Sequence, residues 1–190
     1  MKTLKDFIKE SQEINEGLLG DIVRKLLDTG LSWIEGSAKW VADHIVKTTA
    51  ELWNTTKHIT DKGWDILRTR SGHGGYGAPK DEYEYAKIMA GLHRGKYLDD
   101  DLKYIDDTFK KLKSEFGSDD DWVKIIHIEH MQACFKALSN PKTPDEQRKK
   151  ALNELNHIKL LDKNKNGKYG LTKQIDDFLK DYEKHNDNKK

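Results

Sequence analysis

The segment between Asp162 and Lys173 has the residue spacing closest to that of a metal site. Asp162, Asn164 and Asn166 stand at positions one, three and five of an EF-hand calcium loop, and Gly167 stands at position six. Position twelve, which should be a bidentate glutamate, is Lys173, and three more lysines interrupt the loop. Because a dication needs carboxylates, we interpret the segment as a polar turn between helices and predict no metal and no other cofactor.

A second group is formed by His127 and His130, which lie three residues apart on a predicted helix. Zinc-binding helices use close histidine pairs, but the metalloprotease motif has the order HExxH, whereas here Glu129 directly precedes His130. A third ligand would have to come from His93 or His157. We therefore expect this pair to occupy an ordinary half-exposed helix face.

Catalytic residues are not predicted. No serine stands in a nucleophile elbow, and acidic pairs such as Asp106 and Asp107 are typical of helix surfaces. The single cysteine, Cys134, excludes a disulfide framework and lies in an apolar stretch where we expect it to be buried. The sequence thus favours a non-enzymatic protein.

The composition of the chain excludes further classes of protein. Among 190 residues, 35% are hydrophobic and 35% are charged, with a formal net charge of +1. This balance is typical of thin amphipathic helices, and it lacks the basic excess of most nucleic-acid-binding proteins. No run of about 18 apolar residues predicts a membrane span, and the N-terminus does not have the pattern of a secretory signal.

The secondary structure predicted around these residues is helical throughout, so we predict an all-α fold. Long amphipathic helices at the N-terminus are expected to be joined by a glycine-rich linker to a small bundle of about five helices. The chain divides into a leading segment (1–16), an amphipathic region (17–70), the linker (71–79) and the bundle (80–190).

The amphipathic region has two parts. Its first part carries an apolar stripe that we interpret as a membrane-binding or partner-binding face, because Trp33 follows it: Leu18, Leu19, Ile22, Val23, Leu26, Leu27 and Trp33. Its second part repeats apolar residues eleven apart, as in Trp53 and Trp64, which predicts a long, nearly straight helix. The alternative is that the stripe packs on the bundle.

Within the bundle, the spacing of apolar residues predicts a helix over 98–116 that ends at Gly117. Ser118 and Asp121 predict the cap of the next helix. Thr143 to Glu146 reads as a capping box with Pro144 at the first helical position.

The leading segment (1–16) has a sequence pattern that is also found in a known family of proteins. It starts with Met1-Lys-Thr, continues with Phe7-Ile8 before an acidic residue, and ends with Ile14-Asn15-Glu16 before Gly17. This pattern resembles the capsid-targeting peptide of internal head proteins from large tailed bacteriophages, in which a prohead protease cuts after a glutamate that has Leu or Ile two residues before it. Leu4, Phe7 and Ile8 form its apolar targeting face, and Ile14, Glu16 and Gly17 its processing site.

The resemblance covers only about the first seventeen residues. It implies a virion protein that is packaged in the capsid interior, contacts the prohead scaffold and the prohead protease, and is delivered into the host cytoplasm. The alternative is an amphipathic protein that binds a membrane or a partner helix. A degenerate calcium module is the least favoured reading.

Overall fold

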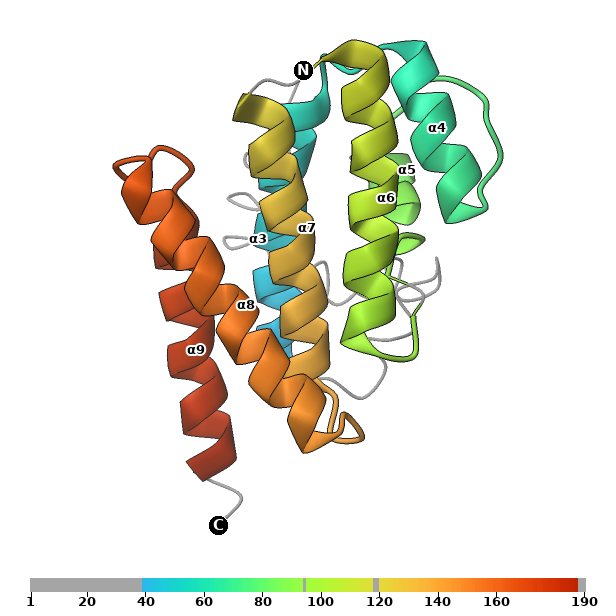
Figure 1. Cartoon of the computed structure of the whole chain (residues 1–190). Coiled ribbons are helices and arrows are strands. Elements are labelled where there is room, and N and C mark those ends of the chain that lie inside the picture. The colour runs from blue at the N-terminus through green and yellow to red at the C-terminus, as the bar shows by residue number, and fades with distance from the viewer. Residues whose placement is uncertain (1–38, 94, 118–119, 188–190) are drawn as a thin grey trace, which may run out of the picture.

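The computed structural model describes residues 39–93, 95–117 and 120–187 (Figure 1). This part of the chain forms seven α-helices and contains no strand, so the all-α prediction is confirmed for it. The helices are α3 (Lys39–Thr56), α4 (Asp61–Ser71), α5 (Glu82–Ala90), α6 (Leu98–Phe116), α7 (Asp120–Ser139), α8 (Asp145–Asn164) and α9 (Leu171–Asp187). None of them is apolar over a length that could cross a bilayer.

Helix α7 lies at the centre of the bundle. It packs against α3, α6, α8 and α9, and Figure 1 shows it between α8 and α6 with α3 behind. A helix surrounded in this way must be apolar on most of its circumference. The buried residues of α7 satisfy this requirement, and Phe135 stacks on Phe178 of α9 with ring centroids 3.8 Å apart.

The long helix expected over the second part of the amphipathic region is wrong, because the chain folds there as α3 and α4. Helix α3 ends at Thr56, and α4 starts after Thr60, whose hydroxyl accepts a hydrogen bond from the amide of Gly63 at 3.4 Å. The Thr60 hydroxyl therefore satisfies a free amide at a helix start, and the eleven-residue apolar repeat continues across a break.

Helices α3 and α4 share one core with the helices that follow the glycine-rich segment. Leu52 and Leu67 are fully buried, and Trp64 packs edge-on against Tyr85 of α5 at 5.4 Å between ring centroids. For residues 39–70, the apolar face thus packs on the bundle, and the core shows no boundary at residue 70.

The glycine-rich segment is held against α4. The amide of Gly77 donates to Asp65 Oδ1 at 2.6 Å, and Arg68 Nε donates to the carbonyl of Gly77 at 2.8 Å. The Arg68 guanidinium also pairs with Glu84 of α5 at 2.7 Å. These bonds connect α4 to α5 through the segment, so residues 72–81 form an ordered connection within one body.

Two helix boundaries test the sequence predictions inside the bundle. Helix α6 spans Leu98–Phe116 and ends at Gly117, as predicted. Helix α8 starts at Asp145 with Pro144 as its N-cap and no side-chain cap bond, so the capping box predicted at Thr143 is wrong. Instead, Arg148 Nε reaches back to the carbonyl of Thr143 at 3.0 Å and fixes the preceding turn.

Candidate functional site

Several ionisable side chains lie close together where α6, α7 and α8 meet. Helix α8 approaches α6 at its start, where Gln147 and Lys150 both bind Asp99. It then crosses α7 diagonally, and in Figure 1 its C-terminal end lies well away from α6. Helices α6 and α8 therefore diverge toward the N-terminal end of α7.

His130 of α7 lies between two carboxylates, one from α6 and one from α8. Its Nε2 is 2.9 Å from Asp106 Oδ1 of α6, and its Nδ1 is 3.1 Å from Glu154 Oε1 of α8. Burial alone would lower the pKa of His130, but the hydrogen bonds and charges of Asp106 and Glu154 outweigh it and raise this pKa to about 9. The hydrogen bond from His130 also lowers the pKa of Glu154. His130 is thus an imidazolium whose two N–H groups both donate, which leaves no lone pair for a metal or for base catalysis.

His127, one helical turn earlier, has the opposite charge state. Its ring centroid lies 6.2 Å from that of His130. Burial, and next the charge of His130, lower the pKa of His127 to about 4, so its imidazole is neutral near pH 7. His127 is half-buried, but His130 is only 8% exposed, so the prediction of one half-exposed pair is wrong for His130. The two partners of His130 come from helices far apart in sequence.

A second buried pair was not predicted from the sequence. His93 follows α5, and its Nε2 lies 2.9 Å from Glu129 Oε2 on α7, with both side chains inside the core. The signal in the sequence is Glu129 itself, which interrupts the most apolar stretch of the chain. A carboxylate at such a position needs a partner, because an unpaired buried charge is costly.

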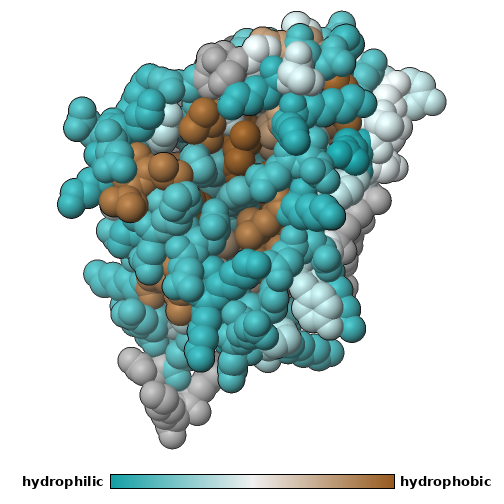
Figure 2. All heavy atoms as spheres, in the orientation of Figure 1, coloured by the Kyte–Doolittle hydropathy of each residue, from teal (hydrophilic) through white to brown (hydrophobic). Residues whose placement is uncertain are grey.

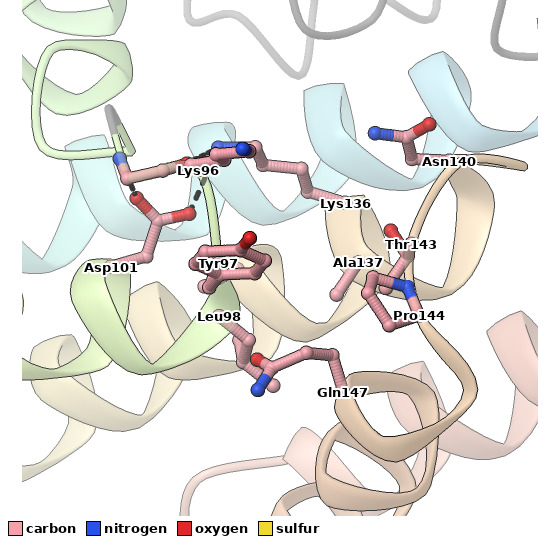
Figure 3. A pocket seen from close by; sticks show the side chains of 12 residues that line it. Lys96, Tyr97, Leu98, Asp101, Lys136, Ala137, Asn140, Thr143, Pro144 and Gln147 are labelled. Atoms are coloured by element: carbon pink, nitrogen blue, oxygen red, sulfur yellow. Dashed lines mark hydrogen bonds and ion pairs between the residues drawn. The ribbon is translucent and has the colours of Figure 1, made fainter.

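A small hollow lies between the starts of α6 and α8 and the end of α7 (Figure 3). Lys136 lies beside it, and its Nζ donates to Asp101 Oδ2 at 2.9 Å and to the carbonyl of His93 at 3.0 Å. Asp101 also accepts from the amide of Gly95 at 2.6 Å. The cavity volume is about 20 Å³, which suits one water and not an organic substrate.

The carboxylate of Asp162, at the first position of the calcium-like loop, binds donors of the protein itself. Its carboxylate accepts from the amides of Tyr169 (3.0 Å) and Thr172 (2.9 Å) and from the Thr172 hydroxyl (2.9 Å). These bonds lower the pKa of Asp162 despite its burial. Asp162 therefore caps α9, which fits the polar-turn interpretation of the loop.

Metal ligands do not converge elsewhere in the part of the chain that the structure covers, where no group of three or more histidine, cysteine, aspartate or glutamate side chains is arranged to hold an ion. Cys134 is fully buried in α7, as predicted, and burial raises the pKa of its thiol.

The residues predicted for processing, targeting and membrane or partner binding all precede Lys39 and lie outside the described residues. They are Leu4, Phe7, Ile8, Ile14, Glu16, Gly17, Leu18, Leu19, Ile22, Val23, Leu26, Leu27 and Trp33. These assignments remain predictions from the sequence.

Comparison of the chain with protein-family models, with curated proteins and with solved structures finds no match.

Proposed function

We propose that this protein is a non-enzymatic internal head protein of a tailed bacteriophage. Its first sixteen residues direct it into the prohead, where they contact the scaffold or the capsid interior, and the prohead protease removes them by cutting after Glu16. The mature chain then starts at Gly17, stays in the capsid interior, and enters the host cytoplasm with the genome.

The observation that carries the proposal is the order of features in residues 1–17. A Met1-Lys-Thr start, the pair Phe7-Ile8 and the sequence Ile14-Asn15-Glu16 occur together at one end of the chain. One apolar face over Leu4, Phe7 and Ile8 suits a short helix that adds to a helical scaffold surface. The segment carries three lysines against four acidic residues, so its recognition would depend on shape and apolar contact more than on net charge.

The helical body supports a role as packaged cargo. Its conspicuous polar side chains bind one another: His130 binds Asp106 and Glu154, and Asp162 caps α9. Side chains used in this way hold helices together and are not free to bind a substrate.

The proposal is tested by producing the chain together with phage proheads and measuring its mass in purified particles. We expect the wild-type chain to be packaged and to have the mass of a protein that starts at Gly17. The variant Glu16→Gln should be packaged at full length, because its cleavage site is lost. Glu13→Gln is the matched control, since it changes a neighbouring glutamate that has Ser11 two residues before it, and it should be cut normally.

Two results would argue against the proposal. Absence of the wild-type chain from particles would remove the targeting role of residues 1–16. A packaged wild-type chain that keeps its full mass would remove the processing site after Glu16.

A further inference from the structure

The turn between α8 and α9 contains a side chain and a backbone amide that can react with each other. Asn166 precedes Gly167, and among the asparagines of the chain it alone precedes a glycine. Glycine has no Cβ to cover its amide nitrogen, so this nitrogen can approach the side-chain amide of the preceding asparagine. In Figure 1 the turn lies at the edge of the bundle, and in Figure 2 hydrophilic side chains project from that edge.

Both reacting groups are open to water. Residues 163–168 are all exposed, and a Cβ added at Gly167 would have no atom within 4 Å. Asn166 has a φ of 56° and Gly167 a φ of 70°, so the chain reverses here in the left-handed region that asparagine and glycine tolerate. Neighbouring side chains therefore do not shield the Asn166 amide or an intermediate formed from it.

One hydrogen bond restrains the backbone nitrogen. The amide of Gly167 donates to the carbonyl of Asp162 at 2.8 Å and so satisfies one of the last carbonyls of α8. An amide whose proton is held in this way is not available to attack a neighbouring carbon. The carboxylate of Asp162 also anchors the far side of the turn, on Tyr169 and Thr172. The turn must therefore open before the nitrogen reacts, and exposed turns open far more readily than whole domains unfold.

We propose that Asn166 is a site of spontaneous deamidation and that the hydrogen bond from Gly167 to Asp162 sets its rate. The amide nitrogen of Gly167 gives up its proton and attacks Cγ of Asn166. The N–Cγ bond forms, the Cγ–Nδ2 bond breaks, and Nδ2 leaves with a proton as ammonia. Water then opens the cyclic imide at one of its two carbonyl carbons. Attack at Cγ gives aspartate, and attack at the backbone carbonyl carbon of residue 166 gives isoaspartate.

The two products change the turn differently. Aspartate at position 166 adds a negative charge among the exposed Lys163, Lys165 and Lys168, and it leaves the length of the backbone unchanged. Isoaspartate adds a methylene group to the backbone, so the amide of Gly167 is displaced from the carbonyl of Asp162. Only isoaspartate should therefore loosen the connection to α9. The reaction needs no enzyme and is independent of packaging in a capsid.

The test is to incubate the full chain at neutral pH and physiological temperature and to follow each asparagine by mass spectrometry. Cleavage after glutamate releases the peptide 155–183, which contains Asn156, Asn164 and Asn166. Replacing an amide by a carboxyl group raises the mass by about one dalton, and fragmentation of the peptide assigns the change to one residue. Asn156 and Asn164 are exposed but precede larger residues, so they are internal controls.

We expect Asn166 to be converted while Asn156 and Asn164 stay unchanged. In the chain unfolded by guanidinium chloride, Asn166 should react roughly three- to tenfold faster, the factor that corresponds to opening one hydrogen bond of ordinary net strength. Asp162→Ala, which removes the anchor of the turn, should bring the rate close to that of the unfolded chain. Asp177→Ala is the matched control, since it changes an exposed aspartate of α9, and it should leave the rate unchanged.

Three results would overturn the inference. An unreactive Asn166 in the unfolded chain would remove the site. Conversion of Asn156 or Asn164 as fast as Asn166 would remove the role of Gly167. Equal rates for Asn166 in the folded and the unfolded chain would show that the hydrogen bond to Asp162 does not control the reaction, and this comparison holds even if Asp162→Ala fails to fold.

Discussion

The replacement His130→Gln should destabilise the protein by an amount that depends on pH in a defined way. In the folded chain, the pKa of His130 is raised from 6.5 to about 9 by Asp106 and Glu154. A group whose pKa is raised by folding stabilises the folded state fully below its unfolded pKa, and that stabilisation is lost as the pH rises through its folded pKa. The contribution of His130 is therefore complete below about pH 6.5 and is lost as the pH rises through about 9.

The size of this contribution follows from the two pKa values. The difference between 6.5 and about 9 corresponds to about 3 kcal/mol of unfolding free energy, and the burial of His130 justifies little reduction for solvent screening. At pH 6.5 we expect His130→Gln to lower the free energy of unfolding by about 4 kcal/mol, of which about 3 comes from the titration and about 1 from hydrogen bonds that the neutral histidine also makes. At pH 10 the wild-type histidine is neutral, and only about 1 kcal/mol should remain from its hydrogen bonds.

The assay is urea unfolding of both proteins, followed by far-ultraviolet circular dichroism at pH 6.5, 8, 9 and 10. Because other titrating groups are the same in both proteins, they largely cancel in the difference between the two free energies. His58→Gln is the control, since His58 and its partner Asp121 are both about half exposed and 3.6 Å apart, and such a pair contributes little. A difference for His130→Gln that stays constant from pH 6.5 to 10 would refute the inference that Asp106 and Glu154 hold His130 as an imidazolium.

Three further predictions concern single side chains. Asp162→Ala removes the cap of α9, including the bonds from Thr172, and should cost about 1 to 3 kcal/mol in urea unfolding, while added calcium should leave the Tm of the wild type unchanged. Gly63→Ala should destabilise the chain although alanine favours helices, because the added Cβ would lie 2.4 Å from Ile59 Cγ2; a Tm equal to or above that of the wild type would contradict this packing. His127→Leu should make the protein less sensitive to acid between pH 6.5 and about 4. Folding lowers the pKa of His127, so the stability that its neutral form maintains above pH 6.5 is lost as the pH falls toward 4. If the Tm of the variant falls between pH 6.5 and 4 as much as that of the wild type, this prediction is wrong.

The helical periodicity was readable from the sequence because it depends on local spacing. The apolar residues of α6 recur at intervals of three and four, and Gly117 ends the helix with a φ of 85°, a backbone conformation that favours glycine. The burial of Cys134 was predictable for the same reason, since the residues around it are apolar.

The break between α3 and α4 was harder to predict from the sequence. Thr60 is a good cap, but the apolar repeat through Trp53 and Trp64 continues on both sides of it and suggests one helix. A periodic pattern reports which residues face the core, and it does not report whether the backbone between them changes direction.

The candidate site depended on tertiary structure almost entirely. His130 meets residues 24 positions away on either side, and Glu129 meets His93 at a separation of 36. Spacing along one helix suggested a pairing of His127 with His130, but their charges are set by the carboxylates of other helices. No local pattern contains that information.

The amino-acid sequence by itself determined the all-α class of the described residues, the end of α6 at Gly117 and the polar turn that follows Asn164, because each follows from the intrinsic geometry of a short stretch of backbone. It also supplies the whole basis of the proposed targeting peptide. Only the tertiary structure decided which histidine is charged and which helices share the core. These properties arise from the distances between side chains on different helices, and packing sets those distances only after the helices have come together.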